Sequence, residues 1–214
     1  MSETIIGTSS EAVESYAQDA QRLFAQVNDH MRELVVRGFH LTYEGPDAYT
    51  SFNPGLTAVA TAAITGMNES MQDFARALST VTSNISRSLG GAGITVTVAP
   101  PVADLPPAPG TLDDDYRIDV AGFDAFISAD IPQTKERVRS LLQANQDRFN
   151  AIPRATASQR GWSGSARDHA QNVVVPAQTE QMHVSLETAL GKVTTFMEDA
   201  KSRAITADAS GVAG

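Results

Sequence analysis

The residues with the clearest chemical potential lie in one short stretch, Arg160 to Ala166, which reads Arg-Gly-Trp-Ser-Gly-Ser-Ala and contains the only tryptophan of the chain. A serine hydrolase carries its nucleophile in a Gly-x-Ser-x-Gly turn between a strand and a helix. Here Ser165 stands where the last glycine of that motif belongs, and the preceding segment has a helical pattern. We therefore expect a structural bend in which Ser163 has no catalytic role.

Other candidate sites for chemistry are incomplete. The sequence contains four histidines, His30, His40, His169 and His183. No two of them stand three or four residues apart, so they do not form a zinc motif. The acidic run Asp113–Asp115 with Asp119 lacks the glycine and the terminal glutamate of a calcium loop. In the glycine-rich segment Gly90–Gly93, Val96 takes the place of the last glycine of a dinucleotide loop. With no cysteine either, we predict no catalytic residues, no metal and no cofactor.

Charge and hydropathy exclude further classes of protein. The formal net charge is −9, and lysine and arginine form no cluster, which argues against nucleic acid or an anionic membrane as a partner. The first residues, Met1–Thr4, lack the basic start and apolar stretch of a secretory signal peptide. No apolar run approaches the ~18 residues of a membrane span. If the protein is exported, we expect a route without a cleaved signal or an anchor.

A proline- and glycine-rich segment divides the chain. Between Gly90 and Gly110 lie five of the ten prolines and four of the fifteen glycines, a composition typical of an extended linker. We predict an N-terminal hairpin over 1–89, a connector over 90–114, a C-terminal hairpin over 115–205 and a flexible tail over 206–214. Two segments beside the proline run, Ile94–Val98 and Tyr116–Val120, alternate apolar and polar residues, which is compatible with a small two-stranded ribbon.

Each half carries two stretches whose apolar residues recur at steps of three and four, the pattern of helices packed along a seam. In the first half the stripes are Ala17, Ala20, Phe24, Val27, Met31 and Leu34, then Ala60, Ile64, Met67, Met71, Phe74, Leu78, Val81 and Ile85. In the second half they are Ile131, Val138, Leu141, Leu142, Phe149 and Ile152, with Thr134 and Asn145 as polar substitutions, then Met182, Leu186, Ala189, Val193, Phe196 and Ala200. We expect a helix to start near Pro132 and a kink near Pro176.

The bends between the paired stripes share a triplet. Tyr43-Glu44-Gly45 lies in the first bend and Trp162-Ser163-Gly164 in the second. The shared layout and triplet indicate an internal duplication. A large ring can cover the end of a helix pair, and glycine permits backbone angles that other residues resist.

A tryptophan-x-glycine bend between two heptad helices, in about a hundred residues, resembles the WXG family of small helical hairpins, relatives of the early secreted antigen of mycobacteria and other actinobacteria. In Trp162-Ser163-Gly164 the motif is intact, and in Tyr43-Glu44-Gly45 it is degenerate. The resemblance implies a non-enzymatic protein that pairs helical hairpins into antiparallel four-helix bundles and follows the type VII secretion route. The family's export signal, Tyr-x-x-x-Asp/Glu after the last helix, has no match here, since Phe196–Ala200 has the wrong spacing.

The predicted fold is all-α: two helical hairpins in one chain, joined by the connector and packed as an antiparallel four-helix bundle. From the resemblance we expect a substrate, partner or chaperone of type VII secretion that acts through protein–protein contacts. It would be cytoplasmic before export and then secreted or bound at the cell surface. The alternative is a structural scaffold that self-assembles through the bundle and connector.

Overall fold

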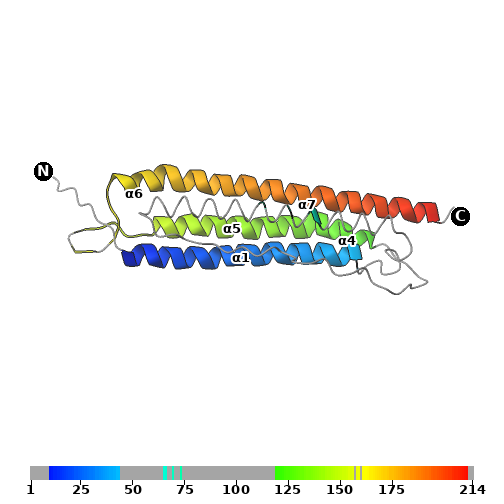
Figure 1. The fold of residues 1–214 in the computed structure, drawn as a ribbon, viewed down its shortest axis with the longest axis horizontal. Coiled ribbons are helices and arrows are strands. Elements are labelled where there is room, and N and C mark those ends of the chain that lie inside the picture. The colour runs from blue at the N-terminus through cyan, green and yellow to red at the C-terminus, as the bar shows by residue number, and fades with distance from the viewer. Residues whose placement is uncertain are drawn as a thin grey trace. The chain divides into compact units, whose positions relative to one another are not determined.

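The computed structural model describes residues 10–43, 65–66, 69, 73, 119–156, 158–159 and 161–211. Most of these residues are helical and none belongs to a strand, so the prediction of an all-α protein is confirmed for the described part (Figure 1). The elements are α1 (Ser10–Tyr43), α4 (Val120–Ala125), the π-helix η1 (Phe126–Asp130), α5 (Ile131–Asn150), α6 (Ser165–His169), the π-helix η2 (Ala170–Val174) and α7 (Val175–Gly211). They form three long helical runs.

Several predictions fall outside the described residues. The connector, the strand over 94–98, Gly45 and the seam Ile64, Met67, Met71, Phe74, Leu78 and Val81 all do so, although Thr65, Gly66, Glu69 and Asp73 of that segment are helical. Tyr43 is the last residue of α1. The strand predicted over 116–120 is wrong at its end, because Asp119 caps α4 and Val120 begins it. Helix α7 continues through Gly211, into the predicted tail.

The chain divides into two compact units, each built from three segments. Unit 1 comprises Met1–Asn28, Phe74–Val98 and Arg137–Leu186, and unit 2 comprises Asp29–Asp73, Ala99–Glu136 and Glu187–Gly214. Each unit therefore draws on both of the hairpins predicted from the sequence.

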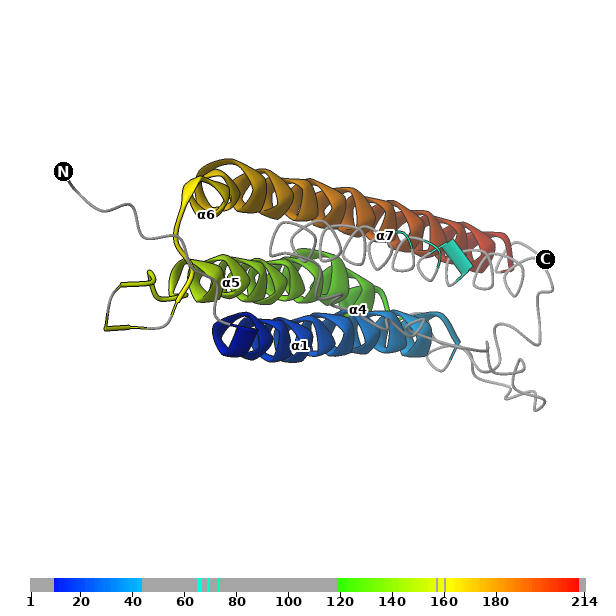
Figure 2. The ribbon, with the colours of Figure 1, turned by 60° about the vertical axis from the view of Figure 1, so that its left-hand side comes forward.

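In unit 1 the first half of α1 runs alongside the second half of α5, as the views in Figures 1 and 2 agree. The apolar stripes predicted from the sequence supply most of its core. Its buried side chains include Tyr16, Ala20, Val27, Val138, Leu142, Phe149, Ile152, Met182 and Leu186. Asn145, predicted as a polar substitution on the α5 stripe, is fully buried among them.

In unit 2 the ion pairs show that α4–α5 and α7 run antiparallel. Lys201 pairs with Asp124, while Lys135 Nζ lies 2.8 Å from Glu187 Oε2. The residue numbers of the partners increase along one helix while they decrease along the other. The buried side chains of this unit include Met31, Leu34, Val35, Phe123, Phe126, Ile131, Ala189, Leu190, Val193, Met197 and Ala200.

One position of the α7 stripe differs from the prediction. Met197 is fully buried, whereas Phe196 is only half-buried. The ring of Phe196 lies directly over Gly66, where an added Cβ would come within 2.2 Å of the ring carbon Cζ. Phe196 therefore packs beside the seam, against the backbone of the segment around Gly66, and Met197 fills the core.

Pro132 and Pro176 both lie inside continuous helical runs. Helix α5 begins at Ile131, near Pro132 as predicted, but it continues the run of α4 and η1 without a break. A π-helix precedes each proline: η1 ends before Ile131-Pro132 and η2 before Val175-Pro176. The residue before each proline donates its N–H five residues back, Ile131 to the Phe126 carbonyl and Val175 to the Ala170 carbonyl. A proline ring collides with the carbonyl four residues back in a regular helix, and the wider π-turn changes that geometry.

The π-turns also keep the buried positions in line. The buried residues on either side of η1 are Phe123, Phe126, Ile131 and Thr134, and those around η2 are Arg167, Ala170, Val175 and Thr179. In both series a step of five, in place of four, crosses the π-turn. Each π-turn thus absorbs one extra residue, and the prediction of a simple heptad stripe missed it for that reason.

Deleting exposed Ala129 from η1, together with Pro132→Ala, should convert the π-turn into a regular α-turn. We expect the free energy of unfolding to change by about 1 kcal/mol or less, since the buried step becomes four residues. Deleting exposed Gln143 from the regular part of α5 is the matched control. It rotates the downstream seam by about 100° and should cost several kcal/mol. Urea unfolding followed by circular dichroism measures both; equal losses would show that η1 does not carry the extra residue.

Candidate functional site

The bend between α5 and α6 folds back on itself through backbone hydrogen bonds. The Trp162 N–H donates to the Pro153 carbonyl over 2.8 Å, which fastens the end of the loop to its beginning. A Cβ on Gly161 would lie 2.2 Å from the same Pro153 oxygen, so the close approach of the two ends of the loop requires glycine. Within the loop the Thr156 N–H donates to the Gln159 carbonyl, and the Gln159 N–H donates to Thr156 Oγ1, both at 3.0 Å.

Trp162 closes the core of unit 1 at this bend. Its side chain is 5% exposed and meets Phe149 edge-on, with ring centroids 6.0 Å apart and an interplanar angle of 85°. Phe149 in turn meets Tyr16 of α1 edge-on at 5.5 Å. Edge-to-face pairs at such distances are the favoured geometry of aromatic rings. These three rings connect the bend, α5 and α1.

The aromatic row ends on a buried polar contact. The Tyr16 hydroxyl donates to Asn145 Oδ1 over 3.2 Å, and both residues are buried. Burial raises the pKa of Tyr16 to about 12, and the hydrogen bond with Asn145 opposes the shift. Sequence reasoning noted Asn145 and placed Ala17 on the α1 stripe, but it missed Tyr16.

Gly164 is the last residue before α6. Its φ is 114°, in the region that side-chain-bearing residues avoid, and its carbonyl accepts the first helical bond from the Asp168 N–H at 3.1 Å. Glycine is therefore needed at the point where the chain turns from Trp162 into the second helix. The structure brings together the two residues that the sequence singled out at this bend.

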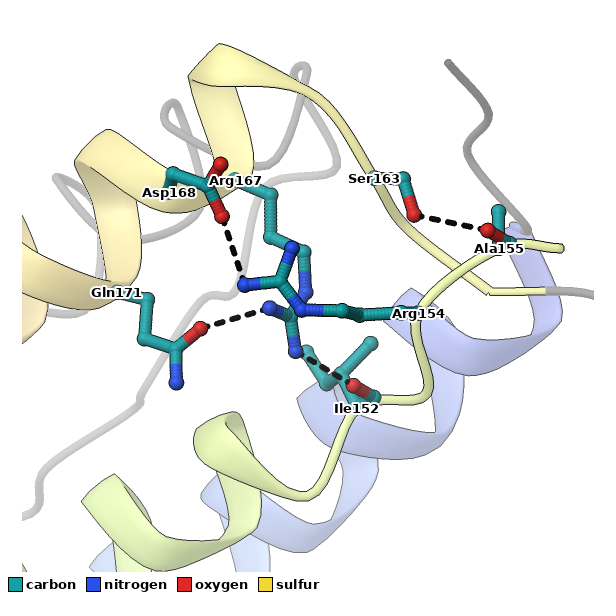
Figure 3. Close-up of polar contacts among 7 residues, drawn as sticks. All are labelled: Ile152, Arg154, Ala155, Ser163, Arg167, Asp168 and Gln171. Carbon is teal, nitrogen blue, oxygen red and sulfur yellow. Dashed lines mark hydrogen bonds and ion pairs between the residues drawn. The ribbon is translucent and has the colours of Figure 1, made fainter. Parts of the chain in front are cut away.

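Ser163 is bound to the loop. Its hydroxyl donates to the Ala155 carbonyl over 3.1 Å (Figure 3). Within the described ranges, no strand precedes it, as a nucleophile elbow requires. The contacts of Ser163 fit a structural role.

An arginine that sequence reasoning missed lies beneath the bend. Arg167 is 4% exposed; its Nη2 donates to the Ile152 carbonyl over 2.9 Å and its Nη1 to Gln171 Oε1 over 2.7 Å (Figure 3). Burial lowers the pKa of Arg167, the nearby charge of Arg154 lowers it further, and Asp168 opposes both. The signal in the sequence that could have indicated its burial is its spacing, because Arg167 stands three residues before buried Ala170 on the same helix face.

The remaining candidates from the sequence are dispersed. Asp119 is the N-cap of α4, where its Oδ1 accepts from the Gly122 N–H at 2.8 Å. His30 lies 3.5 Å from Glu33 within α1, and His169 is exposed on α6. Across the described segments no group of histidine and carboxylate side chains could hold a metal ion. Those segments also contain no helix long and apolar enough to cross a membrane.

Comparisons with known proteins return no match: no family model, no curated protein and no solved structure is similar to this chain. The bend geometry and the helix pattern therefore carry the functional argument.

Replacing Trp162 with alanine should lower the free energy of unfolding by about 3–5 kcal/mol, because the ring fills the end of the core. Ser163→Ala is the matched control from the next position. It removes one hydrogen bond to a carbonyl and should cost about 1 kcal/mol. Urea unfolding measures both. A loss for Ser163→Ala as large as that for Trp162→Ala would contradict this description of the bend.

Tyr16 should make stability fall at alkaline pH. Its pKa in the folded protein is about 12, above the ordinary value of 10.0, so the neutral phenol is favoured by folding. This contribution is fully present below pH 10 and is lost as the pH rises towards 12, by about 2–3 kcal/mol in total. Comparison with Tyr16→Phe isolates it, since the variant lacks the ionisable group. If the free energies of unfolding of the two proteins change in parallel from pH 9 to 12, the prediction is contradicted.

Proposed function

We propose that this chain is a non-enzymatic interaction protein of the WXG kind, a substrate, partner or chaperone of type VII secretion. The observation that carries the proposal is the bend Trp162-Ser163-Gly164. The tryptophan packs into the core between two antiparallel helices, and the glycine takes the left-handed conformation at the start of the second helix. Both residues of the motif thus have a physical task at a helical hairpin, and neither task is catalytic.

We also propose that the two hairpins pair within one chain as a four-helix bundle. In unit 2, the segment that carries the predicted second seam touches α7 at two points: Gly66 against Phe196, and Asp73 Oδ2 at 4.0 Å from Lys192 Nζ. The order of the partners is antiparallel. The contact of α1 with η1, Arg37 Nη1 to Asp130 Oδ1 at 2.8 Å, supports pairing between the halves.

Covalent linkage of the two hairpins favours this pairing. A tether turns association into an intramolecular step, and effective concentrations reach the millimolar range when the linker spans the sites. A chain of this kind needs no second hairpin protein to complete its bundle. Its outer helix surfaces are then available to secretion machinery or to another protein.

Export from the native host tests the functional proposal. We expect the protein in the culture medium or at the cell surface when the secretion ATPase is active, and in the cytoplasm when the ATPase is inactivated. Detection in the cytoplasm alone under both conditions would count against it. Trp162→Phe keeps an aromatic ring in the core. A loss of export in this variant would therefore not be due to unfolding.

Light scattering tests the intramolecular pairing. A monomer whose separated halves 1–89 and 115–214 are poorly folded alone supports one bundle per chain. An obligate dimer with independently folded halves would overturn it. Filaments seen by electron microscopy would favour the alternative, a self-assembling scaffold.

A further inference from the structure

The charges of the chain are divided unequally between the two compact units. Unit 1 holds nine arginines, no lysine and seven carboxylates, a net charge of +2. Unit 2 holds the other seven basic residues and eighteen carboxylates, a net charge of −11. All of the positive charge of unit 1 is therefore on guanidinium groups, which bind carboxylates with two parallel hydrogen bonds where lysine acts as a point charge.

Two arginines and one carboxylate lie close together at the bend. Arg154 Nη2 lies 2.8 Å from Asp168 Oδ1, while among the described residues buried Arg167 donates to two neutral acceptors, the Ile152 carbonyl and the Gln171 amide. Figure 3 shows both guanidinium groups in the space between α6 and the loop. We refer to Arg154 and Arg167 as the bend arginine pair. Arg154, Arg167 and Asp168 together carry a net charge of +1.

Arg167 also has an unsatisfied donor. Its Nε is buried and has no hydrogen-bond partner in the part of the chain that the structure describes, and the residue as a whole is more than nine-tenths buried. A buried charged group with an unmade hydrogen bond costs free energy, and natural proteins keep few of them. Arg154, 57% exposed, is the member of the pair that an incoming group can reach.

A second pair of arginines in unit 1 has the same composition. Arg22 and Arg148, 73% and 63% exposed, both pair with the single carboxylate of Asp19, Arg148 Nε at 3.8 Å from Oδ2. Excess guanidinium over carboxylate therefore recurs on this unit and is not peculiar to the bend.

We infer that the bend arginine pair docks an acidic segment of a partner protein, whose carboxylate binds Arg154 and offsets the net positive charge that Arg154, Arg167 and Asp168 carry together. This deepens the proposed role as an interaction protein and rests on it. An acidic peptide suits the site better than a nucleic acid, because the net charge of −9 repels a long polyanion while a single carboxylate matches a net charge of +1 at the bend.

The full-length protein and a capped oligo-aspartate peptide test this inference. Trp162 is the only tryptophan, and its backbone is hydrogen-bonded to Pro153, next to Arg154, so its fluorescence reports on the bend. Isothermal titration calorimetry gives the dissociation constant independently. We expect saturable binding that weakens with salt, and a dissociation constant about tenfold higher for Arg154→Gln than for the unmodified protein.

The control variant is Arg203→Gln, another exposed arginine that pairs with a single aspartate, Asp199, in unit 2. It should bind the peptide like the unmodified protein. Circular dichroism verifies that Arg154→Gln remains folded. An oligo-asparagine peptide should not bind.

Equal affinity of Arg154→Gln and the unmodified protein would overturn the inference. Binding of inorganic phosphate or of a short single-stranded DNA as tightly as oligo-aspartate would overturn the assignment to an acidic protein segment. Because these measurements are made in solution on the purified chain, their failure is distinguishable from failure of the export test.

Discussion

The edge-on contact of Trp162 with Phe149 holds the helical hairpin at its bend. Through Phe149 and then Tyr16 it reaches from the loop across α5 to α1, so three segments distant in sequence share one row of rings. Burying rings of this size contributes more than any single hydrogen bond in the loop. The loop bonds then have a geometric task. The Trp162 N–H to Pro153 bond and the close approach at Gly161 set where the indole enters the core.

Polar side chains are buried in the helical seams of both units. Asn145, Thr134, Thr179 and Arg167 are all buried, and each stands where a heptad would place an apolar side chain. The Thr179 hydroxyl donates a hydrogen bond to the Val175 carbonyl over 2.9 Å, and Asn145 Oδ1 accepts one from the Tyr16 hydroxyl. A polar residue in such a seam costs stability but disfavours other registers, because a shifted helix would leave it unpaired. The pairing of Asn145 with Tyr16 ties the register of α5 to that of α1.

Much of the described fold was predictable from apolar periodicity, since burial on one helix face leaves a direct mark on residue order. The stripes of α1, α5 and α7 follow from it, and the Trp162-Ser163-Gly164 triplet indicated the bend. What failed depends on the third dimension. Prolines 132 and 176 are tolerated inside helices only because a π-turn precedes each. Whether Phe196 or Met197 enters the core depends on Gly66 in a distant segment, and no local pattern reports that. Arg167 was missed because a charge on an apolar stripe looks like a break in the pattern.

The π-turn η2 links these features. The buried step from Ala170 to Val175 is five residues, and upstream of it Arg167 stands in line with Ala170. In a regular helix the same sequence would rotate Arg167 by about 100° relative to the α7 seam. Its guanidinium would then point away from the Ile152 carbonyl, and the bend arginine pair would not form. One extra residue, stabilised by the proline that follows, therefore determines both how the hairpin closes over Trp162 and which charge lies beneath it.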